Sequence, residues 1–304
     1  MRFTIFQDSH KGGRKVNQDR LAYSYGKDVL LMVIADGMGG HARGEIAAEI
    51  TVNTITNRFQ QEARTTLRRP LDFLHTAFNA AHRAIIAFAD QNDMLESPRT
   101  TCVGCIIQDG KAWWAHSGDS RLYVLRNGRL AATTLDHSRV QQLMDAGLIT
   151  QEQAATHPDR NKIYNCLGGV LPPEVTLSEE WQMEVGDTIL MSTDGFWAHV
   201  PIPFLAGKLM RENIVELLPN LLEEAEKRAG SDSDNLSVVA MTWERQDEVA
   251  DIPTQTITST VPMEGFRTQT NMMQNDGPPS DIVTEDDIER AISEIQSAIK
   301  KVSK

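Results

Sequence analysis

The stretch VLLMVIADGMGGH, from Val29 to His41, constrains the fold more than any other part of the chain. Its first residues form an unbroken apolar run, which is typical of a strand buried in a sheet. The run ends on Asp36, and glycines follow it. A buried strand rarely ends on a carboxylate unless another group pairs with that charge. We therefore expect Asp36 to serve a purpose at the end of its strand.

Further aspartates hold the same position relative to apolar strands. The motifs DTILMSTDGF, HSGDSR, SDSDNLSVV and NQDR place them beside predicted strand ends, at Asp194, Asp119, Asp234 and Asp19. A single Asp-Gly pair is more often a turn than a ligand. Several aspartates beside strand ends are different, because loops can bring them together in one place.

Converging carboxylates repel one another and raise one another's pKa, so a bound cation is the natural resolution. The candidate ligands are oxygens, without paired Cys or His, which favours the hard cations Mg²⁺ or Mn²⁺. Gly37, directly after Asp36, allows the backbone to come close enough for its carbonyl to contribute.

The remaining pattern predicts an α+β fold of mostly antiparallel sheets with helices outside. Asp109-Gly110 and Asn127-Gly128 indicate hairpins, and helical spacing of apolar residues predicts helices over Glu45–Glu62 and Leu71–Asn92. Strands are predicted at Arg2–Gln7, Leu21–Tyr25, Val29–Ala35, Thr101–Gln108, Lys111–Ser117, Arg121–Arg126, Gly186–Ser192 and Leu236–Thr242.

The composition excludes several classes of protein. A formal charge of −12 argues against a nucleic-acid partner. No apolar run is long enough to span a membrane, and the N-terminus lacks a signal-peptide pattern. Cys102 and Cys105 have metal-ligand spacing, but on a strand they face opposite ways, so we expect neither zinc nor redox chemistry. A reducing cytoplasmic location fits best.

The chain divides into a compact region at 1–244, a linker at 245–283 and a helix at 284–304. The linker is rich in Thr, Gln and Pro, without periodicity, and is predicted to be disordered. Thr284 is a good N-cap for the final helix, whose single apolar stripe needs a partner surface. Thr254–Thr256 and Thr268–Thr270 repeat Thr-Gln-Thr, which suggests phosphorylation by a kinase and recognition by a forkhead-associated domain.

Seven motifs of the chain together resemble those of a known family. GGRKVNQDR, ADGMGGH, SGDSR, LDHSRVQQLMDAGLIT, HPDRNKIYNCLGG, STDGFW and SDNLSVV occur in the order and spacing of one family. Residues 1–244 resemble the metal-dependent protein phosphatases (PPM, the type-2C Ser/Thr phosphatases), and the bacterial branch most of all. The resemblance implies a four-layer α-β-β-α sandwich that hydrolyses phosphoserine and phosphothreonine in proteins, opposing a bacterial Ser/Thr kinase.

The resemblance also implies roles for the aspartates. Asp36 would bridge two divalent cations, the Gly37 carbonyl would bind one, and Asp194 and Asp234 would bind the first. Asp19 would act from behind these ligands or through water. Two cations about 3.5–4 Å apart would lower the pKa of a shared water, whose hydroxide would attack phosphorus in line.

Arg14 matches the arginine that binds phosphate in the family, and its planar fork suits a bidentate grip. Many relatives have a histidine, a proposed general acid, where this chain has Met38, which cannot donate a proton. His41 and water remain alternatives, so the general acid stays unassigned.

The chain also departs from the family pattern at the site of a third cation. The family holds it with the aspartate that matches Asp119 and with another that matches Ala198 here. We expect a third cation to bind weakly at Asp119, unless His199 or another group substitutes.

Other residues of the motifs are predicted to be structural. His137 and His157 belong to segments that resemble the flap beside the family's active site. Thr150 and Gln153 form a capping-box pattern, and Arg121 is expected to form an ion pair.

Two alternatives to a protein phosphatase remain open. The chain could be a pseudophosphatase that acts as an adaptor through its tail, or it could hydrolyse another phosphoester. The intact Asp36, Asp194, Asp234 and Arg14 argue against the adaptor. The acidic composition and the lack of a glycine-rich loop for a base argue against a nucleotide substrate.

Overall fold

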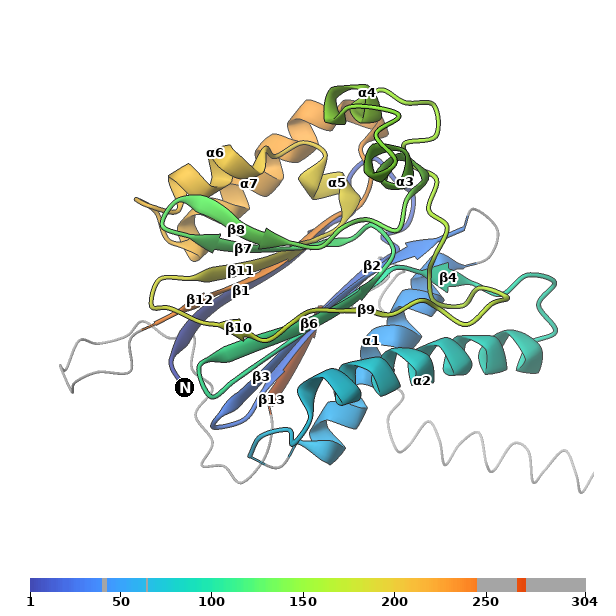
Figure 1. The fold of residues 1–304 in the computed structure, drawn as a ribbon. Coiled ribbons are helices and arrows are strands. Elements are labelled where there is room, and N and C mark those ends of the chain that lie inside the picture. Colours follow the sequence, from blue (N-terminus) through green and yellow to red (C-terminus); the bar gives the residue numbers. More distant parts are fainter. Residues whose placement is uncertain (40–42, 64, 245–266, 272–304) are drawn as a thin grey trace, which may run out of the picture. The chain divides into compact units, whose positions relative to one another are not determined.

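The computed structural model describes residues 1–39, 43–63, 65–244 and 267–271, and Met1–Met272 form one compact unit. Two antiparallel sheets face each other in this unit (Figure 1). The smaller has the order β1 (Phe3–His10), β12 (Leu236–Trp243), β11 (Thr188–Ser192), β7 (Arg121–Arg126), β8 (Arg129–Thr133). The larger has the order β10 (Trp181–Gln182), β6 (Lys111–Ser117), β5 (Cys102–Gln108), β3 (Val29–Met38), β2 (Asp19–Tyr25), β13 (Arg267–Asn271). The short strands β4 (Arg99–Thr100) and β9 (Thr176–Leu177) pair with β3 and β6.

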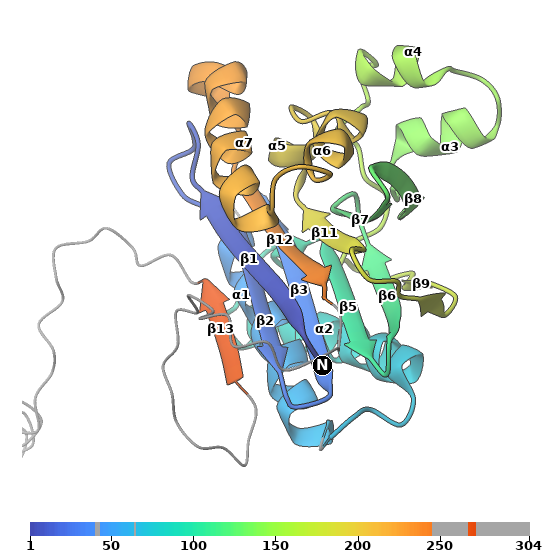
Figure 2. The ribbon, with the colours of Figure 1, turned by 90° about the vertical axis from the view of Figure 1, so that its left-hand side faces the viewer.

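Helices cover the outer faces of both sheets. In Figures 1 and 2, α1 (Gly44–Glu62) and α2 (Pro70–Gln91) lie against the larger sheet. The smaller sheet is covered by α5 (Asp194–Trp197), α6 (Ile202–Lys208) and α7 (Ile214–Ala229), and a 3₁₀ turn, η1 (Gly230–Asp232), follows α7. Between β8 and β9 the chain forms α3 (Arg139–Asp145) and α4 (Gln151–Ala155). The predicted α+β, four-layer α-β-β-α sandwich is confirmed.

The apolar run of β3 is explained by its central place in the larger sheet. Its alternate residues pack into two different cores: Leu31 and Val33 face the helices α1 and α2, while Leu30 and Met32 face the smaller sheet. Both faces of the strand are therefore covered, which removes the usual polar alternation. Cys102 and Cys105 also fall in different cores, as predicted, and the cysteines are free.

The predicted strands and the two predicted helices occur, with ends shifted by up to a few residues. One shift matters for the site: β3 continues to Met38, so Asp36 lies inside the paired strand and not at its end. The largest omission is α7, which carries Pro219 in its interior. Proline normally breaks a helix; Pro219 is the sixth of the 16 residues of α7, whose apolar face packs on the smaller sheet along its length.

The structure corrects the prediction of a linker without regular structure at 245–283. Within it, Arg267–Asn271 form β13, which pairs antiparallel with β2 in the register Thr268↔Ser24 and Thr270↔Ala22. The edge of β2 offers unpaired backbone groups, and the β-branched threonines favour an extended chain. Residues 245–266 and the predicted helix 284–304 lie outside the described residues. Among the residues described, no helix is long and apolar enough to cross a membrane.

Candidate metal centre

Asp36 and Asp19 stand directly opposite each other on the neighbouring strands β3 and β2. The backbone of Asp36 is fixed from the other side of β3: its N–H donates to Thr101 Oγ1 at 3.1 Å, and its carbonyl accepts from the Thr101 N–H at 2.8 Å. The Thr100 hydroxyl donates to the same carbonyl at 2.8 Å. Asp36 is therefore held on a rigid backbone beside a second carboxylate.

Gly37 is a point of close backbone contact. A Cβ atom at this residue would lie 2.3 Å from the carbonyl oxygen of Gly44, at the start of α1, and 2.7 Å from that of Gln18. Any larger residue would push α1 and the 11–18 loop away from β3. Its N–H donates to the Gln18 carbonyl at 3.2 Å. This crowding agrees with the prediction that a glycine at residue 37 allows a close approach of the backbone.

Asp194 and Asp234 reach the same place from the smaller sheet. Asp194 begins α5 directly after β11, and Asp234 lies just before β12, which pairs with β11. A Cβ atom on Gly195 would lie 2.1 Å from the Asn235 carbonyl oxygen, so the two turns can touch only through a glycine.

The carboxylates interact electrostatically, and their pKa values show it. Burial, with the charges of Asp194 and Asp234, raises the pKa of Asp19 to about 7. Burial and the facing Asp19 raise the pKa of Asp36 well above its usual range. Burial and Asp234 raise the pKa of Asp194 to about 6. These groups share one low-dielectric, negatively charged region, which is costly without a cation.

Arg14 lies at this cluster. Its Nε and Nη2 donate to the two oxygens of Asp234 at 2.8 and 2.7 Å, a bidentate pair. Asp194 and Asp36 add to the electrostatic stabilisation of the guanidinium, which raises its pKa further. Arg14, the predicted phosphate-binding residue, thus lies among the predicted metal ligands, and more than half of its side chain is exposed to solvent.

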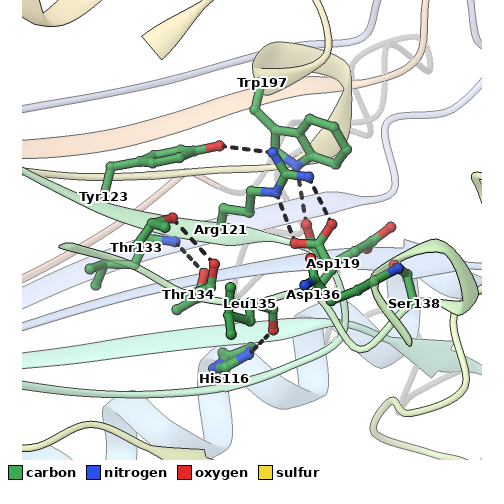
Figure 3. A network of polar contacts seen from close by, with 12 residues as sticks. His116, Asp119, Arg121, Tyr123, Thr133, Thr134, Leu135, Asp136, Ser138 and Trp197 are labelled. Carbon is green, nitrogen blue, oxygen red and sulfur yellow. Dashed lines mark hydrogen bonds and ion pairs between the residues drawn. The ribbon is translucent and has the colours of Figure 1, made fainter. Parts of the chain in front are cut away.

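Asp119 interacts electrostatically with Asp194 of the cluster, and its backbone is held by the network that Figure 3 shows from close by. Burial and Asp194 raise its pKa to about 8. Its backbone carbonyl accepts from Trp197 Nε1 at 3.1 Å. Arg121 lies 3.5 Å from the centre of the Trp197 ring and donates to both oxygens of Asp136 at 2.8 Å. The predicted ion pair of Arg121 is confirmed, and it holds the loop of Asp119 in place.

The predicted structural roles of the flap residues are also confirmed. His137 Nδ1 faces the Gly118 N–H at 3.2 Å and Asn165 Nδ2 at 2.6 Å, and burial lowers its pKa to about 4. Thr150 and Gln153 form the capping box of α4. His157 Nδ1 accepts from the Asp159 N–H at 3.0 Å. His41, the alternative proton donor, lies outside the described residues.

Sequence reasoning missed the residues that join the two sheets at the centre. Thr193 donates to Asp19 Oδ2 at 2.8 Å and accepts from the Ser237 N–H at 3.0 Å. Asn235 accepts from the Gln18 N–H at 2.8 Å and donates to the carbonyls of Lys11 and Val16 at 2.8 and 3.2 Å. Both stand inside the quoted motifs, next to an aspartate, and that adjacency was the available signal.

The donor set fits hard divalent cations. The ligands are carboxylate and carbonyl oxygens, and Asp19 Oδ1 is buried without a hydrogen-bond partner in the part of the chain described. As the described side chains stand, no group of three His, Cys, Asp or Glu is arranged to hold one ion. Arg14 occupies Asp234 in this structure, so a cation bound by Asp234 requires the guanidinium to turn away.

Comparison with known proteins identifies the family. The sequence model of the family described as "Protein phosphatase 2C" matches residues 6–227. This chain belongs to that family. It is therefore an enzyme, a protein-serine/threonine phosphatase, with the metal dependence that is general in the family.

Curated relatives agree with this assignment. A "Putative protein phosphatase 2C-type" of Streptococcus pyogenes is 32% identical over 70% of this chain and 83% of its own length. The serine/threonine protein phosphatase PstP of Mycobacterium tuberculosis is also 32% identical, over 76% of this chain. The match spans only 43% of the length of PstP.

Solved structures show the same fold. The S. agalactiae serine/threonine phosphatase is 30% identical, with a TM-score of 0.73 over 80% of this chain and 100% of that one. The catalytic domain of PstP in complex with two manganese ions is 30% identical, with a TM-score of 0.66 over 79% of this chain and 97% of that one.

Proposed function

We propose that this phosphatase hydrolyses phosphoserine and phosphothreonine in proteins with two divalent cations, Mn²⁺ or Mg²⁺, held by Asp36, the Gly37 carbonyl, Asp194 and Asp234. The observation that carries the proposal is the convergence of carboxylates from both sheets, Asp19 buried and the others partly buried, on one place that also holds Arg14. A relative of the same fold carries two manganese ions.

The cations, when bound, supply an ionised water as nucleophile at neutral pH and positive charge toward the phosphate. The residues of the chain position the ligands and the phosphate. Asp36 stays on the rigid backbone of β3, and Thr193 orients Asp19 behind it. Arg14 leaves Asp234 and binds the phosphate oxygens with the same bidentate fork. Met38 has no proton to donate and so does not act as the general acid.

The experiment that tests the function is release of phosphate from a phosphothreonine peptide by the full chain, with Mn²⁺, with Mg²⁺ and with EDTA. We expect turnover that depends on the cation. No turnover with either cation, together with retained binding of a partner protein, would favour the pseudophosphatase adaptor instead.

Arg14→Ala should raise KM about tenfold or more and lower kcat by less. The reason is that a guanidinium that binds phosphate equally in the ground and transition states contributes mainly to binding. Steady-state kinetics on p-nitrophenyl phosphate measure both constants, and Lys15→Ala, an exposed cation beside it, is the control. A fall in kcat at unchanged KM would contradict this role.

Ala198→Asp should create a tighter third cation site with Asp119. Ala198 follows α5 and its N–H donates to the Asp194 carbonyl at 2.9 Å, so a carboxylate there starts close to the existing cluster. Calorimetric titration with Mn²⁺ should show an additional binding event in the variant. An unchanged isotherm would count against a third cation site formed by Asp119 and residue 198.

The partners follow from the same proposal. The substrate is a phosphorylated protein, and a Ser/Thr kinase is the enzyme that it opposes in the cytoplasm. A kinase or forkhead-associated domain that binds through the tail stays a prediction. For Thr268 and Thr270 it now requires β13 to leave β2 first, because a kinase binds an extended, accessible segment.

A further inference from the structure

Beside the metal centre the structure has a cavity of about 580 Å³. Met38 and Gly39, which directly follow the metal-binding part of β3, line one side of it. Tyr164, Val170 and Leu171, from the segment between α4 and β9, line the other. The cavity therefore begins at Met38, two residues beyond Asp36 on β3.

The apolar residues at its rim are exposed to an unusual degree. Val170 is 93% exposed, Leu171 78% and Tyr164 51%. Single exposed apolar residues are common, but a group of them around a cavity is typical of a binding site.

The segment that carries Val170 and Leu171 is held firmly at its base. The Asn165 side chain, itself buried, bonds both the N–H and the carbonyl of Glu174, at 2.9 and 2.7 Å, and so closes the loop. Leu167 exchanges two backbone hydrogen bonds with Thr100 of β4, at 2.9 and 3.1 Å.

A third anchor lies under the same loop. The Gly168 N–H donates to His82 Nδ1 of α2 at 3.1 Å. Gly168 has φ +80°, and a Cβ atom on it would lie 2.1 Å from the Pro98 carbonyl oxygen. A loop fixed at these points presents its apolar tip, and does not bury it, because its base cannot move inward.

We propose that this cavity binds an apolar side chain of the phosphoprotein substrate, two or three residues from the phosphorylated Ser or Thr. This deepens the proposed function and rests on it. An extended peptide rises about 3.3 Å per residue. Met38 is two residues from Asp36 on the same strand, so a neighbour at that separation, about 7–10 Å from the phosphoresidue, reaches the cavity.

The test uses the full chain with Mn²⁺ and one phosphothreonine peptide in which leucine replaces alanine at each position from −3 to +3. We expect one position, at ±2 or ±3, to raise kcat/KM about tenfold, which is the effect of burying one large aliphatic side chain. In Val170→Ser and Leu171→Ser that gain should disappear. Hydrolysis of the all-alanine peptide and of p-nitrophenyl phosphate should remain as in the wild type.

Leu148→Ser is the matched control, because Leu148 is 69% exposed between α3 and α4 and does not line the cavity. It should keep the leucine preference. The inference is overturned if no position is preferred, or if the preference survives in the Val170→Ser, Leu171→Ser double variant.

Two further outcomes are distinguishable from these. If the serine variants change activity on every substrate, and only when residues 284–304 are present, the occupant is the chain's own tail and the inference is wrong. If the wild type hydrolyses neither the peptides nor p-nitrophenyl phosphate with Mn²⁺ or Mg²⁺, the proposed function itself fails, and the inference fails with it.

Discussion

Asp36→Asn and Asp194→Asn should each lower kcat by about a thousandfold or more, which corresponds to about 4 kcal/mol of lost transition-state stabilisation. The change from carboxylate to amide keeps the shape and removes one negative charge from the ligand set. A site with less negative charge binds its cation more weakly, and the cation then positions the phosphate less well. Hydrolysis of p-nitrophenyl phosphate and of a phosphothreonine peptide at saturating Mn²⁺ measures the effect.

Two controls separate loss of the site from loss of the fold. A circular dichroism melt of each variant should show that it is folded, because the site carboxylates oppose folding when no cation is present. Asp28→Asn changes a half-exposed aspartate in the turn between β2 and β3, at the opposite end of these strands from Asp19 and Asp36, and should retain full activity. Near-normal turnover in either site variant would end the two-cation assignment.

The sequence predicted the clustered aspartates because each stands beside an apolar run, and such runs are the strongest local signal in a chain. It placed Asp36 at the end of its strand, whereas β3 continues to Met38 by pairing with β4. That pairing depends on Thr100 and Asp36 being close, and a contact between residues 64 apart in the sequence has no local signature.

The same reason explains what the sequence did not reveal about the site's supports. Thr193 and Asn235 make their bonds across the two sheets, to Asp19 and to the 11–18 loop. From sequence alone, a threonine before Asp-Gly and an asparagine after Asp are ordinary turn residues. Likewise β13 exists because the edge of β2 is available for pairing, which the composition of 245–283 does not show.

The destabilisation caused by the clustered negative charges should be measurable by comparing the stability of the wild type with that of Asp19→Asn in the absence of metal. In the folded protein the pKa of Asp19 is raised from 3.8 to about 7. The folded state thus holds a proton that the unfolded state has released, so this group's contribution to stability falls as pH rises from about 4 through 7. Asp36, Asp119 and Asp194, whose pKa values are also raised, act in the same direction.

Other groups share this pH dependence, so the comparison must be between variants. Asp8 and Glu226 raise the pKa of His10 to about 9, which favours folding below its unfolded value of 6.5 and is lost as pH rises through 9. His10 is the same in the wild type and in Asp19→Asn. The difference between the two proteins at each pH therefore isolates the site.

In EDTA at pH 8, Asp19→Asn should be more stable than the wild type by on the order of 2 kcal/mol, since one buried charge is removed and Asn can still accept the Thr193 hydrogen bond. At pH 5 the difference should be smaller, because the folded wild type holds a proton on Asp19 and only the uptake of that proton still opposes folding. With saturating Mn²⁺ the gain at pH 8 should shrink or reverse, because the cations then neutralise the cluster. Urea unfolding at both pH values measures each difference, with Asp28→Asn as the control. Equal destabilisation of Asp19→Asn at pH 5 and pH 8 would show that Asp19 has a purely structural role.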